Sequence, residues 1–130
     1  MDWIREKKIT LLVQIGLEKD KELPDVPLLL DLVSEPNDKS AMRLLSAPTT
    51  IGRPIFTTPN VPQERVEALR KAFDATMKDP AFLAAAQKAN MDLNPVSGER
   101  LQQIVSELFQ TPPAAVARLK EILAPLEQGR

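Results

Sequence analysis

The stretch KITLLVQIG, residues 8–16, decides how the fold of this chain is interpreted. It is rich in aliphatic and β-branched residues and ends at a glycine, which predicts a largely buried strand over Lys8–Ile15. A strand this apolar needs cover on both faces and neighbours in a sheet. The other strand candidates are weak: Arg53–Thr58, and Met91–Val96, which contains a proline and suits an edge.

The remainder of the chain favours helices. Val66, Leu69, Phe73 and Met77 recur every three or four residues, which predicts a helix over Pro62–Met77 with this stripe buried. The other expected helices are Leu28–Ser34, Lys39–Ser46, Ala81–Ala89, one capped by Ser97, and a last one capped by Thr111 and closed by Pro125. One clear strand, two weak strands and four to five helices predict a helix-rich α/β fold.

Prolines and polar residues predict where these helices begin and end. Asp79 before Pro80 is typical of an N-cap followed by proline at the first helical position. Asn90 is expected in the left-handed conformation that ends a helix. Pro36 is expected to end the first short helix, and Ala47–Gly52 is expected to be a loop, because proline and glycine interrupt helices.

Composition excludes several classes of function. The formal net charge is −1 and aromatic residues make up 4%, so neither a basic field nor stacking platforms favour nucleic acid as a partner. Cysteine and histidine are absent, which removes thiolate nucleophiles, cysteine-based zinc sites and histidine-based catalytic triads. We therefore expect no enzyme, no catalytic residue, no metal site and no cofactor. Residues 1–8 contain no apolar run typical of a signal peptide.

The order of the segments resembles the C-terminal portion of the solute-binding receptors of the tripartite tricarboxylate transporters. The resemblance rests on the apolar strand, on Leu-Pro-Asp-Val-Pro at residues 23–27, on Asp79-Pro80, and on Ser97-Gly98-Glu99. Leu-Pro-Asp-Val-Pro is its most specific element. The chain departs from the family at residues 50–54, Thr-Ile-Gly-Arg-Pro, and at residues 111–113, Thr-Pro-Pro. Members of the family are also about twice as long or longer.

The resemblance implies a two-lobe fold like that of periplasmic binding proteins, which closes around a small organic carboxylate and delivers it to membrane transporter subunits. It also implies a periplasmic location. Under this interpretation residues 1–47 are a remnant of the second lobe, residues 48–59 are the crossover or hinge, and residues 60–130 are the helical C-terminal part of the first lobe. A truncated receptor of this kind is not expected to bind ligand unaided.

Three residues of the expected crossover are candidates for ligand binding. The guanidinium of Arg53 is suited to a bidentate pair with a carboxylate, and the hydroxyls of Thr49 and Thr50 are suited to the same anion. The alternative is that all three are ordinary solvated loop residues.

Two further hypotheses stay open. The chain has the amphipathic periodicity of a small helical interaction or adaptor domain that binds no ligand. An uncovered apolar strand also predicts self-association, with Lys8–Ile15 pairing between chains. A hydrolase or lyase is disfavoured, because no constellation of carboxylates accompanies the missing histidine and cysteine.

Overall fold

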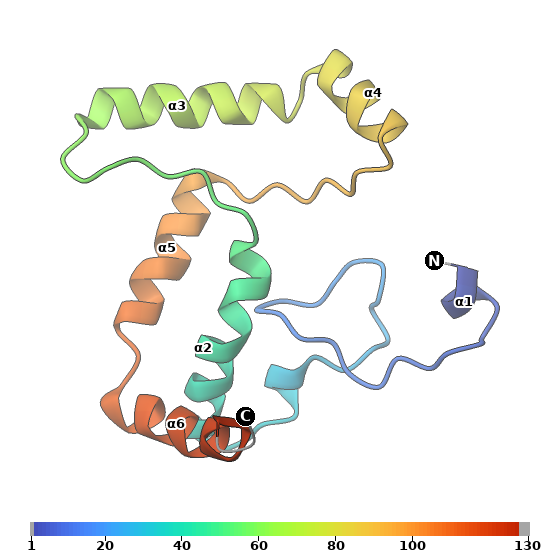
Figure 1. Ribbon diagram of the computed structural model, residues 1–130, viewed down its shortest axis with the longest axis vertical. Coiled ribbons are helices and arrows are strands. Elements are labelled where there is room, and N and C mark those ends of the chain that lie inside the picture. The colour runs from blue at the N-terminus through green and yellow to red at the C-terminus, as the bar shows by residue number, and fades with distance from the viewer. Residues whose placement is uncertain (1, 128–130) are drawn as a thin grey trace. The chain divides into compact units, whose positions relative to one another are not determined.

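The computed structural model of the protein describes residues 2–127 (Figure 1). Its described part is helix-rich, as predicted, and contains no β-strand; one isolated parallel bridge joins Gln14 to Leu28. The strand predicted over Lys8–Ile15 is therefore wrong, and so are the weak strands at Arg53–Thr58 and Met91–Val96. A strand is stabilised by a hydrogen-bonded ladder with a neighbour, and none of these segments has a ladder.

The contacts of the chain divide it into two compact units. Unit 1 comprises Met1–Gly52 together with Ser106–Arg130, and unit 2 comprises Arg53–Val105. Helix α5, Gly98–Phe109, contributes residues to both units. The assignment of residues 1–47 and 60–130 to two receptor lobes stays a prediction.

Unit 1 is built around one pair of helices. Its elements are α1 (Asp2–Arg5), the short 3-10 helix η1 (Leu29–Asp31), α2 (Pro36–Ile51), the end of α5, and α6 (Pro113–Glu127). Helix α2 packs against α6 and also contacts η1. Ala41, Ala47 and Ala115 are completely buried, as expected where small side chains let helices approach closely.

Helix α2 is longer at both ends than the sequence predicts. Pro36 begins this helix instead of ending the preceding one, and residues 47–51 are helical, which contradicts the loop expected at Ala47–Gly52. Pro48 lies inside the helix, where it removes one backbone hydrogen bond. Ala47 is completely buried, and the Gly52 N–H donates to the Pro48 carbonyl, so the helix continues through the proline where the local sequence predicts a loop.

The last helix also differs from the prediction at both ends. The carbonyl of Pro112 accepts hydrogen bonds from the backbone N–H groups of Ala115 and Val116. Pro112, and not Thr111, is therefore the residue before the first helical position. Pro125 does not close α6, because the helix continues to Glu127. A proline this near the C-terminus disturbs only the final turn.

Unit 2 follows the local predictions closely. Its helices are α3 (Gln63–Thr76), α4 (Pro80–Lys88) and most of α5. The carboxylate of Asp79 accepts a hydrogen bond of 2.8 Å from the Phe82 N–H, which confirms the predicted cap. Asn90 has a φ of 52°, and the Ser97 hydroxyl accepts from the Arg100 N–H at 3.2 Å, so both of these predictions are confirmed.

The core predicted for unit 2 is largely missing. Among its residues, all of which the structure describes, only Ala86 and Ile104 are buried. Leu69 leaves 56% of its surface exposed, and Phe73 is half-buried, so the predicted buried stripe of α3 is wrong. An amphipathic stripe is fully buried only when another element lies over all of it, and α3 has no fully buried residue.

Candidate functional site

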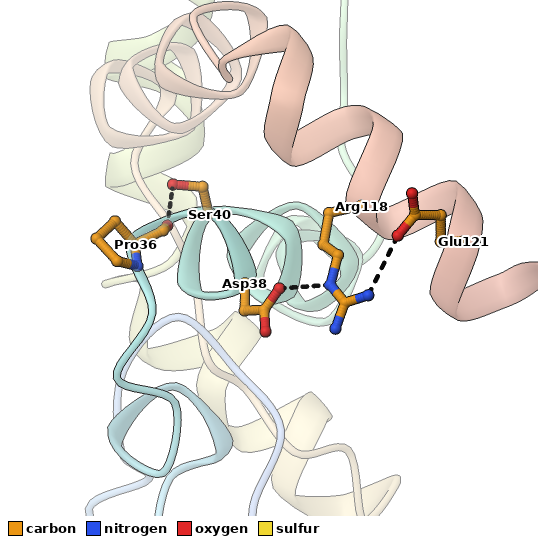
Figure 2. A network of polar contacts seen from close by, with 5 residues as sticks. All are labelled: Pro36, Asp38, Ser40, Arg118 and Glu121. Carbon is orange, nitrogen blue, oxygen red and sulfur yellow. Dashed lines mark hydrogen bonds and ion pairs between the residues drawn. The ribbon is translucent and has the colours of Figure 1, made fainter.

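A polar network joins α2 to α6 (Figure 2). Arg118 donates from Nε to Asp38 Oδ1 at 2.7 Å and from Nη1 to Glu121 Oε2 at 3.2 Å. The hydrogen bond to Asp38 is the main cause that raises the pKa of Arg118, and the bond to Glu121 adds to it. Because its own neighbours engage this guanidinium, the network holds two helices together and does not present a free cation to a ligand.

A second ion pair ties α2 to the end of α5 within unit 1. Arg43 donates to a carboxylate oxygen of Glu107, and both side chains are partly buried. On the same helix, the Ser46 hydroxyl is fully buried and has no hydrogen-bond partner among the described residues. The ion pair attaches α2 to the end of α5, and the buried Ser46 hydroxyl is available to no ligand from solvent.

The structure places Thr49 and Thr50 in the last turn of α2, not in a loop. The Thr49 hydroxyl donates to the Ser46 carbonyl at 2.7 Å, and the Thr50 hydroxyl accepts from the Leu17 N–H at 3.4 Å. The backbone of unit 1 therefore already engages both hydroxyls. Arg53 is exposed and is the first residue of unit 2. These residues do not form a completed anion site within either unit.

Arg70 and the start of α5 form the main polar cluster of unit 2. Arg70 pairs with Glu99 at 3.4 Å and donates to the side-chain oxygen of Gln102. A Cβ added to Gly98 would stand 2.7–3.0 Å from three atoms of the Arg70 side chain. Because Gly98 has no side chain, the Arg70 side chain can pack directly against its backbone. Sequence reasoning treated Ser97-Gly98-Glu99 as a helix start and missed this second role.

The shallow concavity between α3 and α4 offers little chemistry. It is lined by Ala75, Thr76, Asp79 and Phe82. Its two polar side chains are already engaged, because Asp79 caps α4 and the Thr76 hydroxyl donates to the Ala72 carbonyl at 2.8 Å. No group of three metal-ligating side chains gathers anywhere in residues 2–127.

Three segments without secondary structure, which we term the open segments, carry exposed apolar side chains. They are Ile9–Val13 in unit 1 and Arg53–Thr58 and Asp92–Val96 in unit 2. None of their backbone groups hydrogen-bonds to the backbone of another described residue. Their exposed side chains include Leu12 at 78% and Phe56 at 85%.

Comparison with family models, with curated proteins and with solved structures finds no match for this chain. None of the described helices combines the length and the apolar character needed to cross a membrane.

Proposed function

We propose that this chain acts as the C-terminal part of a two-lobe extracytoplasmic receptor that captures a small organic carboxylate. In this role the open segments, which form no strand in this chain, pair with strands of the rest of the receptor: Ile9–Val13 in the second lobe, and the two segments of unit 2 in the first lobe. The helices of unit 2 cover one face of the sheet of the first lobe. The resemblance at residues 23–27, 79–80 and 97–99 supports the choice of family.

The observation that carries the proposal is the poor burial of unit 2. Helix α3 has no buried residue, and Ile55 and Phe56 are 82% and 85% exposed. Apolar side chains of this size gain about 1.5–3 kcal/mol each when they are fully removed from water. Extended backbone without a ladder favours pairing with another strand. Both features are expected of a piece that packs against a sheet.

The ligand site would be incomplete in this chain. The exposed guanidinium of Arg53 is free to pair with a carboxylate, but the hydroxyls of Thr49 and Thr50 are engaged by the backbone of unit 1. Opposing groups from the rest of the receptor would be needed to enclose the anion, and closure of the lobes would bring them together. Delivery of the ligand to membrane transporter subunits follows from the same proposal.

Detection of the native protein tests the proposal. An antibody against unit 1 is used to probe extracytoplasmic and cytosolic fractions of cells that encode the chain. The proposal expects an extracytoplasmic species well above the mass of 130 residues. A cytosolic species of 130 residues would contradict it.

Calorimetry on the chain itself tests the incomplete site. Titration with citrate, malate or glutamate is expected to give no binding heat. A dissociation constant below about 10 µM, or roughly −7 kcal/mol, would show that the chain already holds a complete site.

A helical interaction module without ligand is the second candidate function. It is favoured by Phe109, which lies on α5 and is 88% exposed, since lone helices with large exposed apolar residues suit a partner helix. This candidate expects a cytosolic 130-residue species, so the fractionation experiment separates the two.

A further inference from the structure

Gln14 is the one polar side chain in the run from Leu11 to Leu17, and it is half-buried. Its backbone makes both bonds of the parallel bridge: the Gln14 N–H donates to the Pro27 carbonyl at 2.8 Å, and the Gln14 carbonyl accepts from the Leu29 N–H at 2.9 Å. These two bonds bring together the ends of the loop Gly16–Pro27. The loop therefore has the closed shape of an Ω-loop.

The side chain of Gln14 forms hydrogen bonds with three backbone groups of this loop. Its Nε2 donates to the Leu23 carbonyl at 2.9 Å and to the Val26 carbonyl at 2.7 Å. Its Oε1 accepts from the Asp20 N–H at 2.7 Å. Both amide hydrogens and the amide oxygen are thus used. A flipped amide would oppose two carbonyls with an oxygen, so the chemistry fixes its orientation.

The loop adds bonds of its own around this centre. The Leu23 N–H donates to the Asp20 carbonyl at 3.1 Å, and the Val26 N–H donates to the Leu23 carbonyl at 3.2 Å, which forms two successive turns. Asp20 Oδ1 accepts from the Glu22 N–H at 2.8 Å. Pro24 and Pro27 restrict the backbone further. The first turn covers residues 20–23, and the second covers residues 23–26 within Leu-Pro-Asp-Val-Pro.

We propose that Gln14 is a positioning residue that closes a preformed loop, Gly16–Pro27, and fixes the shape of its exposed tip without a bound partner. Lys21, Glu22, Pro24 and Asp25 are exposed on that tip. The hydrogen bonds of the chain itself therefore order this tip. This inference does not rest on the proposed function.

The test compares Gln14→Met with the matched change Gln63→Met on α3, where the exposed glutamine bonds only to Glu67. Amide hydrogen exchange of Asp20 is the readout, because its N–H donates to Gln14 Oε1. Gln14→Met is expected to lower the protection of this amide about tenfold, the effect of losing roughly 1.4 kcal/mol of hydrogen bonding. Gln63→Met is expected to leave it unchanged. Equal protection of Asp20 in wild type and Gln14→Met would overturn the proposal.

Gln14→Glu distinguishes a donor from a merely space-filling side chain. At neutral pH its carboxylate would face the carbonyls of Leu23 and Val26, so the loop should open. Protonation restores a donor, and the repulsion should raise the pKa of this glutamate above its ordinary value of about 4.3. Acidification is therefore expected to restore Asp20 protection in the variant.

The wild-type protein is the control for this pH profile. The other charged groups on the loop and on the neighbouring η1 are the same in both proteins, so the difference between the two profiles isolates residue 14; these groups are Glu18, Lys19, Asp20, Lys21, Glu22, Asp25 and Asp31. Identical profiles in the two proteins would overturn the donor role. Gln14→Met could fail to fold, which loss of the helical circular dichroism would reveal. In that case, comparison of Asp20 protection in Gln14→Glu at acidic and neutral pH still tests whether residue 14 must donate hydrogen bonds to the loop.

Discussion

Helix α2 of unit 1 and helix α3 of unit 2 have similar lengths, 16 and 14 residues, but very different surroundings. Helix α2 packs on α6, with Ala41 and Ala47 completely buried, and Asp38 and Arg43 form ion pairs with other helices. Helix α3 buries no residue, and Arg70 is its main polar link to α5.

The difference shows that local sequence signals can define where a helix forms, but that packing determines whether its apolar residues are buried. An amphipathic pattern defines α3, and the Asp79 cap begins the 9-residue α4, but isolated helices shorter than about 12–15 residues are marginal in water. The serines, the threonines and the proline inside α2 do not favour a helix locally, yet packing against α6 maintains it. Unit 1 thus supports its own helices, whereas unit 2 buries few of its apolar side chains; under the proposed function, the rest of the receptor covers them.

The largest effect is expected at Ile104, the one large buried side chain of unit 2. Ile104→Ala should lower the free energy of unfolding by about 2–5 kcal/mol, since it removes buried atoms and leaves a cavity. Leu69→Ala on the exposed stripe should cost less than about 0.5 kcal/mol. Urea unfolding measures both. Equal losses would mean that α3 is covered in solution and would remove the contrast between the units.

The next largest effect tests the close packing in unit 1. Ala115→Leu should destabilise by about 1–3 kcal/mol, because the fully buried alanine leaves no room for three more carbons. Ala117→Leu makes the same change at an exposed position of α6 and should be nearly neutral. Thermal unfolding of the two variants gives the comparison. A neutral Ala115→Leu would show that α2 and α6 do not pack tightly.

Ser46 gives an expected gain in stability. Its buried hydroxyl has no hydrogen-bond partner within residues 2–127, so Ser46→Ala should stabilise unit 1 by about 1 kcal/mol, the cost of burying an unpaired polar group. Ser40→Ala is the control on the same helix, because the Ser40 hydroxyl donates to the Pro36 carbonyl at 2.9 Å and is not fully buried. Destabilisation by Ser46→Ala in urea unfolding would show that the hydroxyl has a partner.

The smallest effect is expected from Arg118→Gln, because surface ion pairs are screened by water and salt. The variant should melt slightly below wild type, and the difference should disappear in about 1 M NaCl, where the screening length is about 3 Å. Since its neighbours raise the pKa of Arg118, its contribution is complete at neutral pH and is lost only as pH rises through that pKa. A difference that persists at high salt would point to packing by the arginine stem.

The features predicted correctly from the sequence are those set by neighbouring residues. The caps at Asp79 and Ser97 and the left-handed Asn90 depend on a few adjacent positions, and the structure has all three. The strand at Lys8–Ile15 and the burial of Leu69 depend on distant partners, which no local pattern identifies.

The roles of polar side chains were equally hard to predict. Thr49 and Thr50 were expected in a loop, because the packing that carries α2 past Pro48 is not visible in the local sequence. Gln14 could have been noticed as a polar residue within an aliphatic run. Its three side-chain partners, however, lie 6 to 12 residues away and are backbone groups, which leave no mark in the sequence.

Native-state amide hydrogen exchange tests most directly the claim that unit 1 supports its own helices whereas unit 2 buries few of its apolar side chains. Amides in the middle of α2, such as Leu44 and Leu45, should exchange only through large-scale unfolding. Amides in the middle of α3, such as Ala68 and Leu69, should exchange through local opening, which costs little free energy in a helix without buried residues. Equal protection of the two helices would contradict the account.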